Sequence, residues 1–458
     1  MLLAGCAGTQ APRGDSAQLS ALVSTNTPLA PGDTRWPAAD WWSDYGSAEL
    51  DGLVAEAQAA NTDLAMALGR VEQARGRARS AGALLLPSLE LNAGAQRSDG
   101  ANAVVAERWN ADLTLGYEAD LWGRYRAGRD SARLSLLGSR FDHEATRLVV
   151  IGDVADTYAS LMTVRERQAI ARSNLAAARQ LLARVEAMDR VGLALVGDLA
   201  AQRSLVASEE AELAVLGQAE GEFLAALALL VGRPAQGFSV AGDGLDAIAR
   251  NPAVVPGLSS ELLLRRPDIA SAEAGLAAAK ADVRVARAAM LPSITLTAGG
   301  GIEGGTSPSA AFYHLLAGLT QPILDHGRLA GERDTAEGLR MEREGAYRKA
   351  ILQAFSEVER DLTAIASLDR AITALEVQVK EAAHASAAAD ARFRAGVEEI
   401  VASLVAQRTL YAARDRLAQV RGSRLAATIS LQQVLGGGWR VDDPGERATQ
   451  LSYNAPMP

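Results

Sequence analysis

Aromatic residues are scarce in this sequence, at 4% of 458 residues, and positive charge is in deficit. A compact enzyme core usually contains more aromatic side chains, whereas closely packed alanine-rich helices need few of them. The net charge of −9 and the isoelectric point near 5.2 exclude the broad basic surface that phosphate binding requires. We therefore expect a helical tube rather than a sphere, and no nucleic-acid partner.

Long apolar runs and catalytic motifs are also missing. No window of eighteen or more uncharged apolar residues occurs, so the sequence predicts no transmembrane helix. No lysine lies in a phosphate-binding P-loop, and no nucleophile-elbow motif G-x-S-x-G occurs. His143 and Glu144 begin like a zinc-protease helix, but the second histidine is missing. We therefore expect no enzyme activity, no catalytic residue, no metal and no dissociable cofactor.

Cysteine occurs once, as Cys6, at the end of the string LAGC, which matches the lipobox of bacterial lipoproteins. In that motif the thiol is lipidated, so we expect a covalent lipid such as palmitate on Cys6; the alternative is an unmodified cysteine in a disordered tail. Met1 and Leu2 supply neither the basic nor the apolar region of a signal peptide, so we expect either that the natural start lies further upstream or that the chain is trimmed. Ala7 after the cysteine, instead of aspartate, favours the outer membrane.

The stretch from Trp109 to Arg124 has the clearest local pattern in the chain. Over thirteen residues apolar and polar side chains alternate with a period of two, and the second face is entirely polar. A tilted strand needs roughly 9–11 residues to cross a bilayer. The pattern favours a barrel strand, with lipid outside and water inside, over a strand of a soluble sheet. The apolar face comprises Trp109, Ala111, Leu113, Leu115, Tyr117, Ala119 and Leu121.

Long stretches without proline predict long helices. One runs from Gly123 to the residue before Pro234, and the second, between Pro322 and Pro444, predicts a helix over 328–394 of roughly 100 Å. A shorter helical pattern runs from about Ala48 to Leu86, followed by an alternating strand at 88–96. We interpret the glycines of 299–305 as a flexible loop at the outer end of the barrel.

The second half of the chain repeats the first at an offset of about 204 residues, which indicates a duplication. We divide the chain into an N-terminal lipobox and arm (1–40), two structural repeats (41–240 and 241–439) and a C-terminal tail (440–458). The matched strings are DL at 63 with DI at 268, LPSL at 86 with LPSI at 291, GR at 123 with GR at 327, RVG at 190 with RAG at 394, AQR at 201 with AQR at 406, and Gly232 with Gly436.

Each half contributes two strands, and four strands cannot close a membrane barrel, whose smallest forms have about eight. Because open sheet edges are not tolerated in lipid, several chains must share one barrel, and three copies would supply about twelve strands. The fold class that we expect is mainly α with membrane β: a long helical coiled-coil barrel and a transmembrane β-barrel shared by three chains.

Six strings spread over nearly the whole chain resemble the TolC-like outer-membrane factors, and within them the NodT-type lipoproteins of tripartite efflux systems. The resemblance implies an outer-membrane, lipid-anchored homotrimer that extends into the periplasm of a Gram-negative bacterium. It also implies a periplasmic adaptor and an inner-membrane RND-type transporter as partners. The strings are WWSD at 41–44, LLP at 85–87, YEADLWGR at 117–124, SELLLRRPDI at 260–269, QPILDHGR at 321–328 and LGGGW at 435–439.

The resemblance also implies the functional residues. Helical turns at the periplasmic tip contact the adaptor and form a closed gate, and the strands join the helices at two glycine–arginine junctions. Where members of the family often place an acidic ring, this chain has Ala402 and Val405, which favours a small apolar constriction unless Asp198, Glu398 or Glu399 supplies charge. The tip residues are Arg190, Gly192, Asp198, Arg394, Gly396 and Glu398, and the junction residues are Gly123, Arg124, Gly327 and Arg328.

The mechanism that we expect is passive conduction of small molecules through a gated outer-membrane channel, with the acidic balance favouring cations and zwitterions. A lipid-anchored periplasmic adaptor is one alternative, but it would need a regular series of β-strands. A structural helical stalk is another, but it would not explain the duplicated alternating strands.

Overall fold

The computed structural model describes residues 36–100, 103–192, 196–248, 252, 262–305 and 308–440. Cys6, the N-terminal arm up to residue 35 and the tail from residue 441 lie outside the described residues. The chain forms two compact units, each of which draws on both halves of the sequence. Of the described residues, the first unit comprises those in 36–66, 144–267 and 351–440, and the second comprises those in 67–143 and 268–350.

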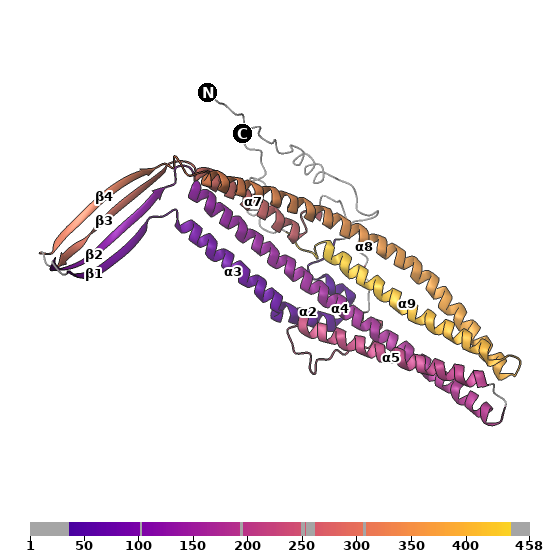
Figure 1. Cartoon of the computed structure of the whole chain (residues 1–458). Coiled ribbons are helices and arrows are strands. Elements are labelled where there is room, and N and C mark those ends of the chain that lie inside the picture. Colours follow the sequence, from indigo (N-terminus) through magenta and orange to yellow (C-terminus); the bar gives the residue numbers. More distant parts are fainter. Residues whose placement is uncertain are drawn as a thin grey trace. The chain divides into compact units, whose positions relative to one another are not determined.

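The helices occur in pairs of equal length (Figure 1). The first-half members α3 (Thr62–Ala83), α4 (Arg124–Arg190) and α5 (Val196–Leu230) have 22, 67 and 35 residues. Their counterparts α7 (Pro267–Ala288), α8 (Arg328–Arg394) and α9 (Ile400–Val434) have the same three lengths. The predicted helix over 328–394 is confirmed, whereas the domain limits 41–240 and 241–439 stay predictions. The remaining helices are η1 (Trp41–Tyr45), α2 (Ala48–Ala60) and η2 (Leu245–Ala247).

The prediction of one helix from Ala48 to Leu86 was wrong, because Asn61 divides it into α2 and α3. The backbone of Asn61 is extended, and its side-chain oxygen accepts hydrogen bonds from the amides of Asp63 (2.8 Å) and Leu64 (3.1 Å). Asparagine is a preferred residue at such a helix start, because its short side chain competes with the helical backbone. Its amide nitrogen also donates to the carbonyl oxygen of Leu230 at 2.8 Å, which fixes the break.

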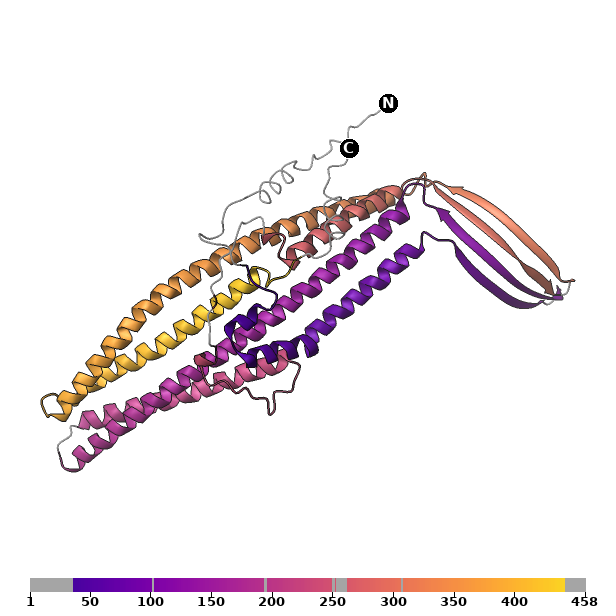
Figure 2. The ribbon, with the colours of Figure 1, turned by 180° about the vertical axis from the view of Figure 1, so that it is seen from behind.

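Four antiparallel strands lie side by side in the second unit, in the order β1-β2-β3-β4 (Figures 1 and 2). They are β1 (Ser88–Gly100), β2 (Ala103–Ala119), β3 (Ser293–Gly305) and β4 (Ala310–Thr320). Both strands expected in the first half are present, and each is longer than its sequence pattern indicated.

The glycine-rich stretch was wrongly predicted to be a loop, because residues 299–305 belong to β3 and pair with β2 and β4. A Cβ atom on Gly301 would clash with the carbonyl oxygen of Ala111, and one on Gly304 would lie 2.7 Å from the ring of Trp109. These glycines therefore let neighbouring strands and a large ring approach closely, which is a recognised use of glycine inside a strand.

Several apolar clusters of described residues hold the helices of the first unit together, and two of them are large. One surrounds Trp41, Tyr45 and Tyr158, and the hydroxyl groups of Ser47 and Tyr158 lie 3.1 Å apart within it. The other joins α4, α5, α8 and α9 through side chains that include Leu181, Leu205, Ala382 and Leu404. The two helix hairpins α4–α5 and α8–α9 thus pack against each other in one body.

One described helix segment, Gly197–Leu230, is long and apolar enough to cross a membrane by length and composition alone. The contacts of this segment, however, are those of a helix packed against α4 and not those of a helix in lipid. Glu220 of this segment accepts hydrogen bonds from Arg165 (2.8 Å) and Gln168 (2.9 Å) of α4. We therefore assign α5 to the helix hairpin, since a lipid-facing helix would have to bury that carboxylate in hydrocarbon.

Candidate functional site

The register of the sheet sorts its side chains into an apolar face and a polar face. Residues paired across an antiparallel ladder point to the same side, so each strand contributes alternate residues to each face. The apolar face comprises Leu89, Leu91, Ala93, Ala95, Trp109, Ala111, Leu113, Leu115, Tyr117, Ala119, Ile294, Leu296, Ala298, Gly300, Ile302, Ala311, Tyr313, Leu315, Ala317 and Leu319. These residues are apolar or aromatic, which suits contact with lipid. The apolar face ends beyond Ala95 and Trp109, where Arg97 and Glu107 pair on the same side and form an ion pair at 3.2 Å.

The opposite face is polar over β1, β2 and β3, and side chains on it form hydrogen bonds with one another. Asp112 accepts from Asn92 (3.2 Å), Asn110 (2.9 Å) and Thr114 (3.1 Å). Such groups need water or one another, because an unpaired polar group in hydrocarbon is costly. The sheet therefore separates a lipid side from an aqueous side, as the sequence of β2 predicted.

The sheet has two free edges. Among the described residues β1 pairs only with β2, and β4 pairs only with β3. An unpaired strand edge exposes a row of backbone amide and carbonyl groups, and no such edge is stable in the hydrocarbon of a bilayer. One chain alone is thus an incomplete membrane structure.

The first strand–helix junction centres on Gly123, whose φ of 75° favours glycine, and on Arg124, which begins α4. Asp120 caps the helix by accepting hydrogen bonds from the amides of Tyr125 (3.1 Å) and Arg126 (2.9 Å). Burial of Asp120 favours its neutral form, but these amides and the guanidinium of Arg126 outweigh burial and lower its pKa. Arg124 binds the carboxylate of Glu118 at 2.8 Å, which ties the helix to the end of β2.

The second junction has the same construction at Gly327, with a φ of 84°, and at Arg328, which begins α8. Asp325 accepts hydrogen bonds from the amides of Leu329 (2.9 Å) and Gly327 (3.1 Å), and these bonds lower its pKa. Arg328 binds Glu332 one turn further along the helix at 2.7 Å. All four predicted junction residues therefore lie where a strand end meets a long helix.

The predicted tip residues lie at the turns of the two hairpins, and both turns lie at the same end of the first unit (Figures 1 and 2). Gly192 follows the end of α4 with a φ of 74°, and Gly396 follows the end of α8 with a φ of 71°. Nothing lies within 4 Å of the Cβ position of either glycine. Each glycine is therefore required by backbone conformation and not by crowding, as expected at a left-handed helix end.

Charged side chains near the two turns form contacts within α4 and within α8, and also between these two helices. The Arg190 side chain donates to the carbonyl oxygen of Glu186 at 3.2 Å, and Arg394 forms an ion pair with Asp390. Asp390 also lies 3.5 Å from Arg184, which connects α8 to α4. Two further predicted acidic residues are only partly exposed: Asp198 lies in the first turn of α5, and Glu398 lies 3.8 Å from Arg392.

The predicted constriction residues lie on the first turns of α9. Val405 is 60% exposed, whereas Ala402 is half-buried. Two further valines that were not predicted, Val397 and Val401, are 78% and 50% exposed. Val401 and Val405 lie four residues apart on α9 and therefore share one face of that helix, and Val397 lies in the turn before it. We refer to these three exposed valines as the valine stripe. The four-residue spacing was readable in the sequence, and it extends the apolar surface towards the turn.

The chain belongs to the outer membrane efflux protein family, whose model matches residues 53–233 and 258–437. It is 40% identical to the pyoverdine export outer membrane protein OpmQ of Pseudomonas aeruginosa, over 93% of this chain and 96% of that protein. It is 32% identical to outer membrane protein OprJ of the same species, over 87% and 86%. The structure resembles the open state of the Neisseria gonorrhoeae MtrE outer membrane channel with a TM-score of 0.82 and 27% identity, over 90% and 95%.

This membership fixes the class of protein. The chain is an outer-membrane channel component of a tripartite efflux system, with long helices and membrane strands, and it works with an adaptor and an inner-membrane transporter. The alternative of a periplasmic adaptor is not supported. The lipid on Cys6 and the roles of the turn, constriction and junction residues stay predictions.

Proposed function

We propose that three copies of this chain form one channel, in which β4 of each copy pairs with β1 of the next. The observation that supports this most strongly is the two-faced sheet with two free edges. Three copies give about twelve strands, enough to enclose a water-filled lumen. The channel carries no catalytic, metal or cofactor site, and a lipid on Cys6 anchors each copy.

The channel conducts passively, and the energy comes from an RND-type transporter in the inner membrane. In the resting state the exposed valine stripe around Val405 closes the tip, because an apolar constriction of this kind excludes water. The adaptor binds the turns at Gly192 and Gly396 and shifts the tip towards its open arrangement. Since the wall is acidic overall, with a chain charge of −9, cations and zwitterions pass more readily than anions.

The mass of the purified protein in detergent tests the assembly. We expect native mass spectrometry to give three times the 47.9 kDa of one chain, increased by bound lipid. A stable species of one chain would show that the free edges of β1 and β4 are covered in some other way, and the shared barrel would be wrong.

Substituting the turn glycines tests the coupling to the adaptor. Valine at position 192 or 396 is expected to lower export severalfold, because a β-branched residue cannot hold the positive φ without about 1–2 kcal/mol of strain. Asparagine at the same positions is the control, since it tolerates this conformation. Export would be measured as drug resistance of a strain that depends on this channel, with trimer abundance determined in parallel.

Normal export by both valine variants would exclude the turns as the coupling element. Loss of the trimer in Gly192→Val or Gly396→Val would instead show that the turns are needed for assembly.

A further inference from the structure

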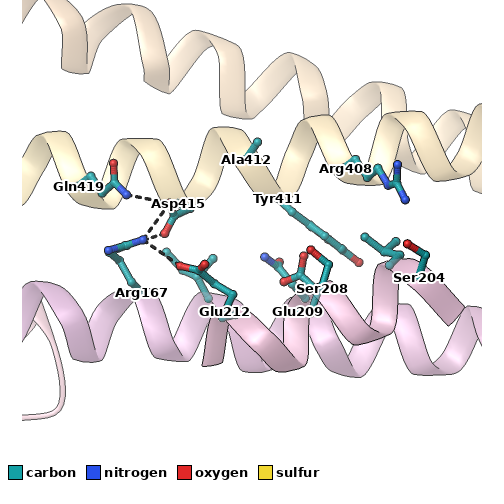
Figure 3. Close-up of a pocket in the computed structure, with 14 residues that line it drawn as sticks. Arg167, Ser204, Ser208, Glu209, Glu212, Arg408, Tyr411, Ala412, Asp415 and Gln419 are labelled. Carbon is teal, nitrogen blue, oxygen red and sulfur yellow. Dashed lines mark hydrogen bonds and ion pairs between the residues drawn. The ribbon is translucent and has the colours of Figure 1, made fainter. Parts of the chain in front are cut away.

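A polar cavity of about 640 Å³ lies between α4, α5 and α9 inside the first unit (Figure 3). Its wall includes Arg167 from α4, Ser208 and Glu209 from α5, and Tyr411 and Asp415 from α9. The cavity thus lies between the α4–α5 hairpin and a helix of the other hairpin. Its size falls within the range of about 300–1,000 Å³ that is common for small-molecule sites.

Two buried polar groups in this wall have no hydrogen-bond partner. Asn174 is 3% exposed and its side-chain oxygen is unpaired, and Tyr411 is 6% exposed and its hydroxyl is unpaired. Buried polar atoms are nearly always paired, since leaving one unpaired costs stability. An amide oxygen can only accept hydrogen bonds, so the site needs a donor.

The charges of the wall show what kind of donor fits. Arg167 is already bound by Asp415 at 2.6 Å and by Glu212 at 3.0 Å (Figure 3). Glu209 forms no ion pair with any other described residue. Burial raises its pKa, and the charges of Glu212 and Asp415 act in the same direction. A carboxylate that is destabilised in this way gains most from a cationic donor placed beside it.

We propose that this cavity binds a small organic amine, whose ammonium group donates hydrogen bonds to the side-chain oxygen of Asn174 and to the carboxylate of Glu209. The amine lies beside Glu209 in the middle of the cavity, because Arg167 lies towards one end and Arg408 lies at the other end, near Ser204 (Figure 3). The ring of Tyr411 crosses the cavity from α9, with its hydroxyl between Glu209 and Ser204 (Figure 3), and an aromatic ring beside the site adds a favourable partner for a cation. A bare metal ion is a poorer fit, since no group of three metal-ligating side chains occurs in the described ranges.

A bound amine would contact α4, α5 and α9 together, and so would hold the two hairpins against each other. Any effect of this contact on conduction depends on the proposed gating at the tip, whereas binding itself does not. Binding and gating can therefore fail independently of each other.

Calorimetric titration of the purified protein in detergent with spermidine tests the site at fixed ionic strength. We expect saturable binding by the unmodified protein and at least a tenfold loss of affinity in Glu209→Gln. The matched control is Glu210→Gln, because Glu210 is the next residue, carries the same charge and forms an exposed ion pair with Arg179 at 2.6 Å. Asn174→Leu, which keeps the shape but removes the acceptor, is also expected to lose affinity.

The native mass of each variant confirms that it remains assembled before binding is compared. Absence of saturable binding by the unmodified protein would overturn the proposal. Equal loss of affinity in Glu209→Gln and Glu210→Gln would also overturn it, because surface charge alone would then explain the binding. Neither result would change the measured mass or conductance, so the proposed channel function would stand.

Discussion

The variant Leu113→Arg is expected to disappear from the outer membrane, whereas Thr114→Arg, one residue further along β2, is expected to assemble. Leu113 pairs with Leu91 and Gly300 in the middle of the apolar face, and Thr114 lies on the polar face beside Asp112. An arginine facing lipid near the bilayer midplane costs about 2–4 kcal/mol per chain. On the aqueous face the same side chain stays hydrated and lies close to a carboxylate.

The measurement is the amount of each variant in outer-membrane fractions, determined against the unmodified chain. The pair is well matched, since both substitutions add the same side chain at neighbouring positions of one strand. Equal assembly of the two variants would show that the apolar face does not contact lipid, and the assignment of the strands to the membrane would fail.

The variant Val405→Asp is expected to raise the conductance of the channel roughly twofold or more, because a carboxylate hydrates a constriction that the valine keeps dry. Val405 is exposed on α9 close to the turn and continues the stripe of Val397 and Val401. The control is Val215→Asp, which adds the same charge at an equally exposed valine on α5 outside this stripe.

Single-channel recordings in a planar bilayer would compare the two variants with the unmodified chain. An unchanged conductance in Val405→Asp would place the constriction elsewhere. An equal rise in Val215→Asp would mean that added charge acts along the whole wall and not at the tip.

Much of the fold was predictable because it depends on patterns that are local in the sequence. The proline-free run predicted α8 over 328–394, and the period-two alternation after Trp109 predicted the face of β2 that is apolar in the structure. Matching strings in the two halves led to the expectation of matching elements, and α4 and α8 indeed have 67 residues each.

The errors arose where a residue's role depends on partners far away in the chain. The glycines of 299–305 have the composition of a loop, and only their pairing with β2 shows that they give room to Ala111 and Trp109. The break at Asn61 is different in part, because its cap on Asp63 and Leu64 is local, and only the additional contact with Leu230 lies 169 residues away. The valine stripe was different, since its four-residue spacing was visible and was overlooked.

The polar cavity could not have been predicted from the sequence at all. Asn174, Glu209 and Tyr411 belong to three helices, and no local pattern distinguishes them from other polar residues of a coiled coil. Their unusual property is that packing leaves two polar atoms without partners, and this property exists only in the folded chain.

The most direct test of the central claim is the conductance of the unmodified protein in a planar bilayer, recorded beside its mass in detergent. The account predicts a species of three chains with a small, flickering conductance, as expected for a water-filled duct that is closed at its tip. A single chain without conductance would contradict the channel and would leave a lipid-anchored helical stalk as the better description.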